Sequence, residues 1–412
     1  MVLFTPFPPN QEVAHVKPAS TIALPRADTS RQPWLRRGLL FALLLLMVAA
    51  PALGGPKGSD TPRALAPLPG DTDSFAQDIN NRGQVVGRSV GAVTTAVVWD
   101  PDGNATALLP LPGATSSFGE GINNRGQVVG RSSTNDPCPV DTAVVWDRHG
   151  VATPLAPLPG DVVSRAFAIN SRGDVSGLSL GPLIAPPACA AAWTAVIWDK
   201  DGNPTALSPL TAPAPLGGFY ESGTGFFGGG GGMNNRGAVV GVSINAAPVD
   251  PAGDFIFVGT LWDRQHNPNR LLADVGCVPV GGCEIQLTNG INNSGVVAGG
   301  GWDINTFAPY ATVWDRDGNP TDLPPLSGDP DAEAFDINNR GAISGTSGTY
   351  PNFGVAGTAV VWDEHSVPNA LPGLPGSASC FGAGINDPGH AVGRCVDAAG
   401  TATAVVWRSN VR

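Results

Sequence analysis

The nonapeptide INNRGQVVG occupies Ile79–Gly87 and returns without change at Ile122–Gly130. Variants of it begin further along the chain: INSRGDVSG at Ile169, MNNRGAVVG at Met233, INNSGVVAG at Ile291, INNRGAISG at Ile337 and INDPGHAVG at Ile385. Each copy is followed by an apolar run that ends in tryptophan, at Trp99, Trp146, Trp198, Trp262, Trp314, Trp362 and Trp407. Seven copies of one unit predict a repeat architecture.

The first unit has the pattern of four strands, which we name a, b, c and d in chain order. DSFAQDI (73–79) alternates apolar and polar residues, QVVGRS (84–89) and TAVVWD (95–100) are rich in valine, and ATALLPL (105–111) follows a PDGN turn. Such runs between Asn, Asp and Gly clusters are typical of short buried strands. Four antiparallel strands in each of seven units predict an all-β fold, a seven-bladed β-propeller.

Three positions of the unit have a physical role that the sequence suggests. The Asn after the first Ile occurs in all seven copies, and we expect its short amide to bond nearby backbone and to hold the a–b turn. The turn glycine, Gly83 in the first unit, supplies a positive φ. We expect the strand-b glycine, Gly87 and its equivalents, to leave room for the tryptophan of strand c, which packs between blades.

The two ends of the repeat region are complementary. The last unit stops at strand c, TATAVVWR, and the first unit is preceded by PRALAPLPG at Pro62–Gly70, which matches strand d of the other units. We therefore predict that this N-terminal strand completes the seventh blade and closes the ring. Closure removes exposed strand edges, which are a hazard for any sheet.

The N-terminal region has the features of an export signal. Arg36 and Arg37 precede an apolar segment, residues 38–53, that contains the small-residue sequence Ala50-Pro51-Ala52. This predicts a signal peptide, with an uncleaved signal anchor as the alternative. We expect an unstructured N-terminus with the signal peptide over 1–57, a single propeller over 58–412, and a secreted, periplasmic or cell-surface protein.

Net charge and cysteine content limit the classes of partner and the cellular compartments that we expect. The formal net charge of −11 argues against nucleic acid as a partner, because a polyanion would be repelled. We expect a monomer that meets the membrane only through the signal segment. The six cysteines fit an oxidising compartment, and their places in the units predict three disulfides: Cys138–Cys189, Cys277–Cys283 and Cys380–Cys395.

The unit resembles the bacterial HAF repeat of extracellular repeat proteins. The resemblance is carried by the pattern IN-N-x-G-x-V-V-G followed by A-x-x-WD-x-x-G, and it covers about Pro62 to Arg412. It implies export and a repeat fold. It brings no established reaction and no catalytic residues to this chain.

Binding residues are expected on the long loops. Insertions fall in the b–c and d–a connections at Leu178–Ala192, Thr211–Gly232, Ser243–Asp254, Leu272–Gln286 and Gly345–Ala356. Loops held by a rigid scaffold concentrate binding residues. We therefore predict that this loop face binds a protein or a glycan through Trp193, Phe219, Tyr220, Phe226, Phe227, Trp302 and Tyr310, although these rings could also pack the loops onto the ring.

Three functions remain open from the sequence. The first is a noncatalytic binding scaffold, the second a carbohydrate-active lyase or hydrolase with acids at the central channel mouth, and the third a structural surface protein. Two or more buried, perturbed acids beside a deep central pocket would favour the enzyme. No cofactor or metal is predicted, because turns such as Asp100–Asn104 resemble the start of a calcium loop but lack the later acid that such a loop needs.

Overall fold

The computed structural model describes residues 61–134, 140–182, 193–210, 220–223, 232–245, 256–271, 285–302, 308–349 and 357–408. The chain divides into Met1–Gly55, which lies wholly outside these residues, and Pro56–Arg412, which contains every described strand. The predicted signal segment, 38–53, thus falls outside the described residues. Within them, no helix is long and apolar enough to cross a membrane.

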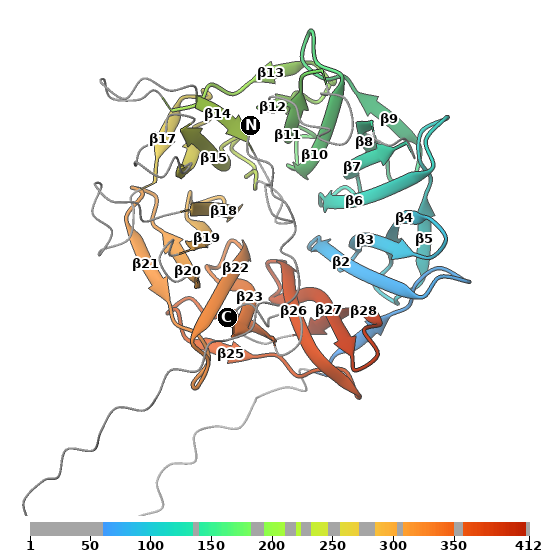
Figure 1. Cartoon of the computed structure of the whole chain (residues 1–412), viewed down its shortest axis with the longest axis vertical. Coiled ribbons are helices and arrows are strands. Elements are labelled where there is room, and N and C mark those ends of the chain that lie inside the picture. The colour runs from blue at the N-terminus through green and yellow to red at the C-terminus, as the bar shows by residue number, and fades with distance from the viewer. Residues whose placement is uncertain are drawn as a thin grey trace, which may run out of the picture. The chain divides into compact units, whose positions relative to one another are not determined.

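The predicted seven-bladed β-propeller is confirmed: seven four-stranded antiparallel blades form a ring (Figure 1). Strand a of the successive blades is β2 (Asp73–Ile79), β6 (Ser116–Ile122), β10 (Val163–Ile169), β14 (Tyr220–Gly223), β18 (Ile285–Ile291), β22 (Asp331–Ile337) and β26 (Ser377–Ile385). Strand b is β3 (Val85–Val90), β7 (Val128–Ser133), β11 (Val175–Leu180), β15 (Val239–Asn245), β19 (Val297–Trp302), β23 (Ile343–Gly348) and β27 (His390–Asp397).

The outer half of each blade is made of strands c and d. Strand c is β4 (Thr94–Trp99), β8 (Asp141–Trp146), β12 (Trp193–Trp198), β16 (Ile256–Trp262), β20 (Pro309–Trp314), β24 (Thr358–Trp362) and β28 (Ala402–Arg408). Strand d of the first six blades is β5 (Ala105–Leu108), β9 (Ala152–Leu155), β13 (Pro204–Ala206), β17 (Pro268–Arg270), β21 (Pro320–Leu323) and β25 (Pro368–Ala370). One parallel backbone pair, Phe257 with Ile285, joins blades 4 and 5 into a continuous sheet.

The ring is closed as predicted by a strand from before the first unit. β1 (Arg63–Leu65) pairs antiparallel with β28, with Arg63 opposite Val406 and Leu65 opposite Ala404. Leu65 is fully buried in a cluster with Trp99 and Val406. The seventh blade therefore takes three strands from the end of the repeat region and one from its beginning.

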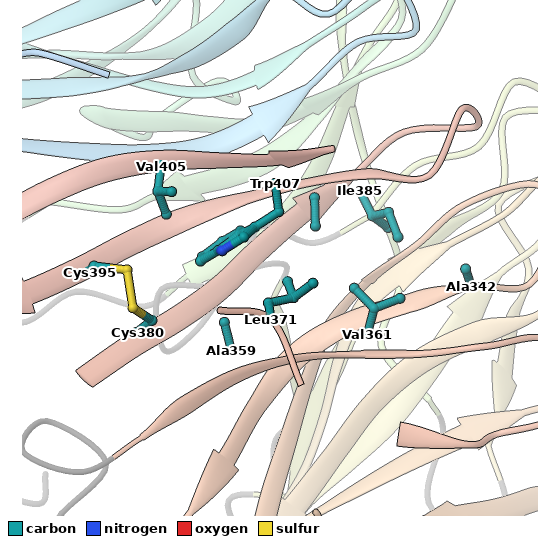
Figure 2. Close-up of a cluster of buried hydrophobic side chains, with 10 residues drawn as sticks. Ala342, Ala359, Val361, Leu371, Cys380, Ile385, Cys395, Val405 and Trp407 are labelled. Carbon is teal, nitrogen blue, oxygen red and sulfur yellow. A yellow bond between two sulfur atoms is a disulfide. The ribbon is translucent and has the colours of Figure 1, made fainter. Parts of the chain in front are cut away.

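The tryptophans at the ends of strand c are wedges between blades, as expected. All seven are at most 1% exposed. In six of them, the indole Nε1 donates a hydrogen bond of 2.6–2.9 Å to a backbone carbonyl of the preceding blade. Figure 2 shows Trp407 of blade 7 packed against Val361 and Leu371 of blade 6. Each indole thus combines apolar burial with a specific polar contact across a blade interface.

The motif asparagine does more than hold its own turn. Asn80 Oδ1 accepts hydrogen bonds from the backbone N–H groups of Arg82 and Gln84, as predicted. Its Nδ2 also donates to the backbone carbonyl of Asn123, the equivalent residue of the next blade. Six such bonds of 2.9–3.2 Å link motif asparagines of neighbouring blades, including one from Asn386 back to Asn80. This series of amide contacts around the axis could not be predicted from the repeat pattern, because it forms between blades.

The expected reason for the strand-b glycine was wrong in most blades. A Cβ on Gly87 would lie 1.9 Å from the backbone carbonyl oxygen of Phe75 in strand a, and no tryptophan atom is among its nearest neighbours. The strand-c tryptophan approaches this glycine closely in two blades, at Gly177 and Gly345, where the strand-a carbonyl is still nearer. The glycine is required because the backbone of strand a presses against strand b.

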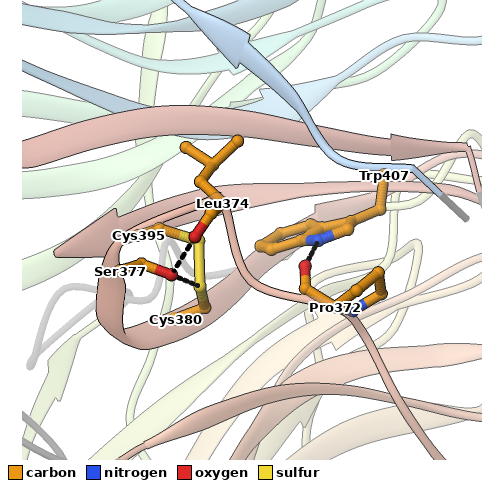
Figure 3. Close-up of a disulfide and its surroundings, with 6 residues drawn as sticks. All are labelled: Pro372, Leu374, Ser377, Cys380, Cys395 and Trp407. Atoms are coloured by element: carbon orange, nitrogen blue, oxygen red, sulfur yellow. Dashed lines mark hydrogen bonds between the residues drawn. A yellow bond between two sulfur atoms is a disulfide. The ribbon is translucent and has the colours of Figure 1, made fainter. Parts of the chain in front are cut away.

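One of the predicted disulfides is present in the described residues. Cys380 and Cys395 are directly opposite each other on β26 and β27, and their sulfurs are bonded (Figure 3). The bridge lies beside Ser377, whose hydroxyl donates to the backbone carbonyl of Leu374 at 2.7 Å. The other four cysteines, Cys138, Cys189, Cys277 and Cys283, fall outside the described residues.

Candidate functional site

A cavity of about 880 Å³ lies at the centre of the ring, and residues from all seven blades line it. Its walls are strand a and the a–b turns, with additional side chains from strand b. A cavity of this size accommodates a ligand larger than a single sugar or amino acid. It is therefore the candidate functional site.

Bulges in strand a supply much of the cavity wall. The register between strands a and b shifts by one residue in blades 1, 2, 3, 5 and 6. A bulge leaves one residue unpaired and turns its side chain away from the regular alternation. The extra residues all line the cavity, and they are Gln77, Glu120, Phe167, Asn289 and Phe335.

Four arginines line one side of the cavity, and we call them the arginine sector: Arg394, Arg88, Arg131 and Arg165. They belong to blades 7, 1, 2 and 3, which are consecutive around the ring. The cavity lining also contains five acidic residues: Asp78, Glu120, Glu333, Asp336 and Asp387. Whether the arginine sector attracts anions therefore depends on which of its members are paired with these or other acids.

Three members of the arginine sector lie over phenylalanine rings. Arg88, Arg131 and Arg394 are on strand b, each opposite a phenylalanine of strand a. Their guanidinium carbons are 4.5, 4.0 and 4.5 Å from the ring centroids of Phe75, Phe118 and Phe381 respectively. Arg394 also lies 5.8 Å from the Phe75 centroid. Cation–π contact fixes the position of each guanidinium and consumes none of its N–H donors.

Two of the four arginines already have carboxylate partners. Arg131 Nη1 is 2.8 Å from Glu120 Oε1, and Arg165 Nε is 2.6 Å from Asp141 Oδ2. The Glu120 and Asp141 side chains are 12% and 3% exposed, whereas those of Arg131 and Arg165 are 22% and 40% exposed, so the carboxylates are more buried than the guanidinium groups they bind. These arginines are neutralised by the chain itself.

Arg88 and Arg394 have no such partner in the part of the chain that the structure describes: no carboxylate lies within ion-pair distance of either. Burial lowers the pKa of both side chains. In Arg88 the charge of Glu120 partly opposes this shift and the charge of Arg131 adds to it. In Arg394 the charge of Arg88 lowers the pKa further. Two half-buried cations beside each other are unfavourable unless an anion compensates them. These two residues are thus the members of the arginine sector that form no ion pair within the described residues.

Two of the three aspartates that line the cavity, Asp78 and Asp336, each lie one residue before the end of a strand a. The carboxylate of Asp78 accepts hydrogen bonds from the backbone N–H groups of Ile79 and, across the blade interface, Ile122. Asp336 accepts from Ile337 and from Ile385 of the next blade in the same way. Burial raises the pKa of Asp78, and burial followed by the charge of Asp78 raises the pKa of Asp336 to about 8. In each carboxylate Oδ1 bonds within its own blade and Oδ2 accepts from the next blade, so both oxygens are engaged and one of them joins blades.

Glu333 is the third acid with a raised pKa at the cavity. It lies on β22 in the same strand-a position as Phe75 and Phe118 of other blades. Burial raises its pKa, and the hydrogen bond that Trp302 Nε1 donates to its Oε1, 3.4 Å long, opposes that shift. The sequence-based criterion of perturbed acids beside a central pocket is therefore met, with Glu333 as the acid not tied to backbone N–H groups in the described contacts.

The predicted loop-face aromatics are only partly visible. Trp193 begins β12, Trp302 ends β19, and Tyr310 is the second residue of β20. None of the three lines the central cavity. Phe219, Phe226 and Phe227 fall outside the described residues, as does the side chain of Tyr220, whose backbone begins β14. Most of the long loops also lie there.

The Asp-x-Asp-Gly-Asn turns are held by turn chemistry. Asp100 Oδ1 accepts from the backbone N–H groups of Asp102 and Asn104, and Asn104 Nδ2 donates to Oδ2. The aspartate oxygens are thus used within the turn. Among the described residues, no three His, Cys, Asp or Glu side chains cluster closely enough to hold a metal ion.

Sequence reasoning missed the arginine sector, although part of its pattern was visible. Arg88, Arg131 and Arg394 each follow the strand-b glycine directly, and Phe75, Phe118 and Phe381 recur in strand a. The recurrence of both residues in three units would have indicated a shared role. Their convergence on one cavity depends on the closed ring, which places unit 7 beside unit 1.

Comparison with known proteins supports the fold. No family model matches the chain, and no curated protein matches it. Solved structures similar to it include puromycin hydrolase (15% identity, TM-score 0.50, 84% of this chain and 55% of that chain) and oligogalacturonate lyase in complex with manganese (10%, 0.50, 82% and 89%). Virginiamycin B lyase from Staphylococcus aureus is also similar (12%, 0.46, 84% and 98%). At these identities the likeness concerns the propeller fold alone.

Proposed function

We propose that the protein is a binding module that takes an acidic glycan in its central cavity. The observation that carries this proposal is the pair Arg88 and Arg394, two adjacent cations in a cavity wall without a carboxylate partner among the described residues. Arginine is well suited to oxyanions because its planar fork offers several N–H donors. The ligand is therefore anionic.

The rest of the cavity wall favours a carbohydrate. Amide side chains line it at Gln77, Asn81, Asn289 and other positions, and Phe167 and Phe335 lie between them. Amides pair with hydroxyl groups, and apolar rings pack against sugar faces. An acidic sugar chain combines the three features that this wall can recognise.

Export and family membership belong to the same proposal. The Cys380–Cys395 bridge supports an oxidising compartment, because structural disulfides persist outside the cytosol. The HAF-like units and the N-terminal apolar segment support an exported repeat protein. A secreted or surface-bound propeller would meet extracellular acidic polysaccharides directly.

The test is binding of purified protein to a panel of acidic oligosaccharides and to the same oligosaccharides after reduction of their carboxyl groups. We expect binding of the acidic forms, weakening as salt is raised, and loss of binding after reduction. The variant Phe226→Ala/Phe227→Ala separates the cavity from the loop face. Capture equal to that of the unchanged protein supports the cavity, whereas loss of capture transfers the function to the loops.

Catalysis on the same ligand is the second candidate, favoured by the raised pKa of Glu333 at the cavity. A carboxyl whose pKa is raised by burial holds its proton more readily than an ordinary glutamate, which suits general acid–base work. The same incubations, analysed for shortened oligosaccharides, test it. If the protein is an enzyme, Glu333→Gln should abolish cleavage and retain binding. If the unchanged protein binds the oligosaccharides but leaves them intact, only the binding function is supported.

A further inference from the structure

Blade 2 contains a complete arginine–carboxylate unit. Arg131 lies over Phe118 with its guanidinium carbon 4.0 Å from the ring centroid, and its Nη1 is 2.8 Å from Glu120 Oε1. Glu120 is the extra residue of the strand-a bulge in this blade. The chain itself therefore supplies an anion to an arginine in this position.

Blades 1 and 7 repeat this unit without the acid. Arg88 lies over Phe75 and Arg394 over Phe381, both at 4.5 Å. The bulge residue of blade 1 is Gln77, and the irregularity of blade 7 contains Ala383 and Gly384. A neutral amide and two small residues thus replace the carboxylate that blade 2 places at its own arginine.

From this comparison within one chain, we infer that Arg88 and Arg394 form a subsite for a carboxylate of the ligand, in the role that Glu120 has toward Arg131. The inference rests on the proposed glycan function and makes it specific: the ligand is a uronate-bearing sugar. Sulfated or phosphorylated sugars are the competing class, and a carboxylate is favoured because it is the group that already occupies the equivalent position in blade 2.

Gln77 and Glu120 are linked across the blade interface. Gln77 Nε2 donates a hydrogen bond of 3.1 Å to Glu120 Oε2, while Glu120 Oε1 binds Arg131. Exchanging the two residues retains the Gln–Glu hydrogen-bonded pair and the net charge, and it moves the internal carboxylate from blade 2 to blade 1. The double substitution therefore places a carboxylate in blade 1, beside Arg88, and removes the one that pairs with Arg131, without a change in net charge.

The first experiment measures the affinity of the full-length protein for galacturonate oligosaccharides by titration calorimetry. Arg88→Gln and Arg394→Gln are each expected to weaken binding by roughly tenfold or more, the usual effect of losing a charged hydrogen-bond pair. Arg131→Gln should have a smaller effect, because Glu120 already neutralises that residue. Arg82→Gln, in an exposed a–b turn outside the cavity wall, is the matched control and should bind as the unchanged protein does.

The second experiment uses the exchanged protein, Gln77→Glu/Glu120→Gln. In this background we expect the roles to reverse, so that adding Arg131→Gln weakens uronate binding roughly tenfold and adding Arg88→Gln has little effect. Thermal unfolding of each variant confirms that it is folded. A general loss of positive charge would not produce this reversal, since the exchange leaves the charge unchanged.

The results distinguish the glycan function from the carboxylate subsite. If no acidic oligosaccharide binds the unchanged protein, both the glycan function and the subsite are overturned, whereas failure of uronates alone overturns the subsite. If they bind but Arg88→Gln and Arg394→Gln have no effect, or the roles do not reverse, the subsite alone is overturned. Tighter binding of sulfated than of uronate oligosaccharides would overturn the assignment to a carboxylate.

Discussion

At the residue scale, Asp336 links the cavity to stability through its ionisation. Its pKa of about 8 in the folded protein lies above the ordinary value of 3.8, because burial and the charge of Asp78 disfavour the carboxylate. Between these pH values the folded protein binds a proton that the unfolded chain releases. The contribution of Asp336 to the free energy of unfolding is therefore full below pH 4 and lost as the pH rises toward 8.

Asp336→Asn should flatten this dependence. The asparagine cannot ionise, so the decrease in the free energy of unfolding between pH 5 and pH 8 should be smaller than in the unchanged protein, although one backbone N–H loses its acceptor. Urea unfolding of the variant and of the unchanged protein at pH 5 and pH 8 measures the pH-dependent decrease and any overall loss of stability. Asp78→Asn is the companion variant, and a decrease as large as that of the unchanged protein in both variants would contradict the assignment.

At the element scale, the bulge in strand a and the glycine in strand b depend on each other. The carbonyl of Phe75, two residues before the bulge residue Gln77, occupies the space where a side chain on Gly87 would lie. The strands therefore approach closely beside the point at which Gln77 is turned toward the cavity. Loss of this glycine should disturb both the sheet and the wall of the site.

Gly87→Ala is expected to lower the free energy of unfolding by about 3 kcal/mol or more, because the new Cβ cannot avoid the backbone 1.9 Å away. Gly113→Ala is the control: its φ is +90° and nothing lies within 4 Å of an added Cβ, so only the backbone strain of about 1–2 kcal/mol applies. Chemical denaturation compares the two. If both variants lose the same free energy of unfolding, the strands can move apart to accommodate the new Cβ, and the prediction for Gly87 is wrong.

At the scale of the whole molecule, ring closure depends on a short strand. Removing residues 61–68 deletes β1, the buried side chain of Leu65 and the carbonyl of Ala66 that accepts from Trp99 Nε1. Burial of a leucine side chain alone stabilises by about 1.5–3 kcal/mol. We expect a clear fall in the melting temperature relative to a chain that starts at residue 61, and unchanged melting would contradict the closure.

The sequence sufficed for the ring and its closure but not for the site. Blade number and strand order follow from local repetition, since each unit carries its own turns and its own tryptophan. The site depends on register: a one-residue bulge decides that Gln77 and Glu120 line the cavity, and strand patterns do not display it. The ion pair of Arg165 with Asp141 joins strands of different blades, so its formation requires the assembled ring.

The seam between β1 and β28 also has a consequence for biosynthesis. A ribosome makes Arg63 long before Val406, so the nascent chain holds an unpaired edge while the intervening blades are translated. A stop codon within β28 would therefore leave β1 without its partner strand, so the ring would stay open. Such a product would be exposed to quality-control proteases.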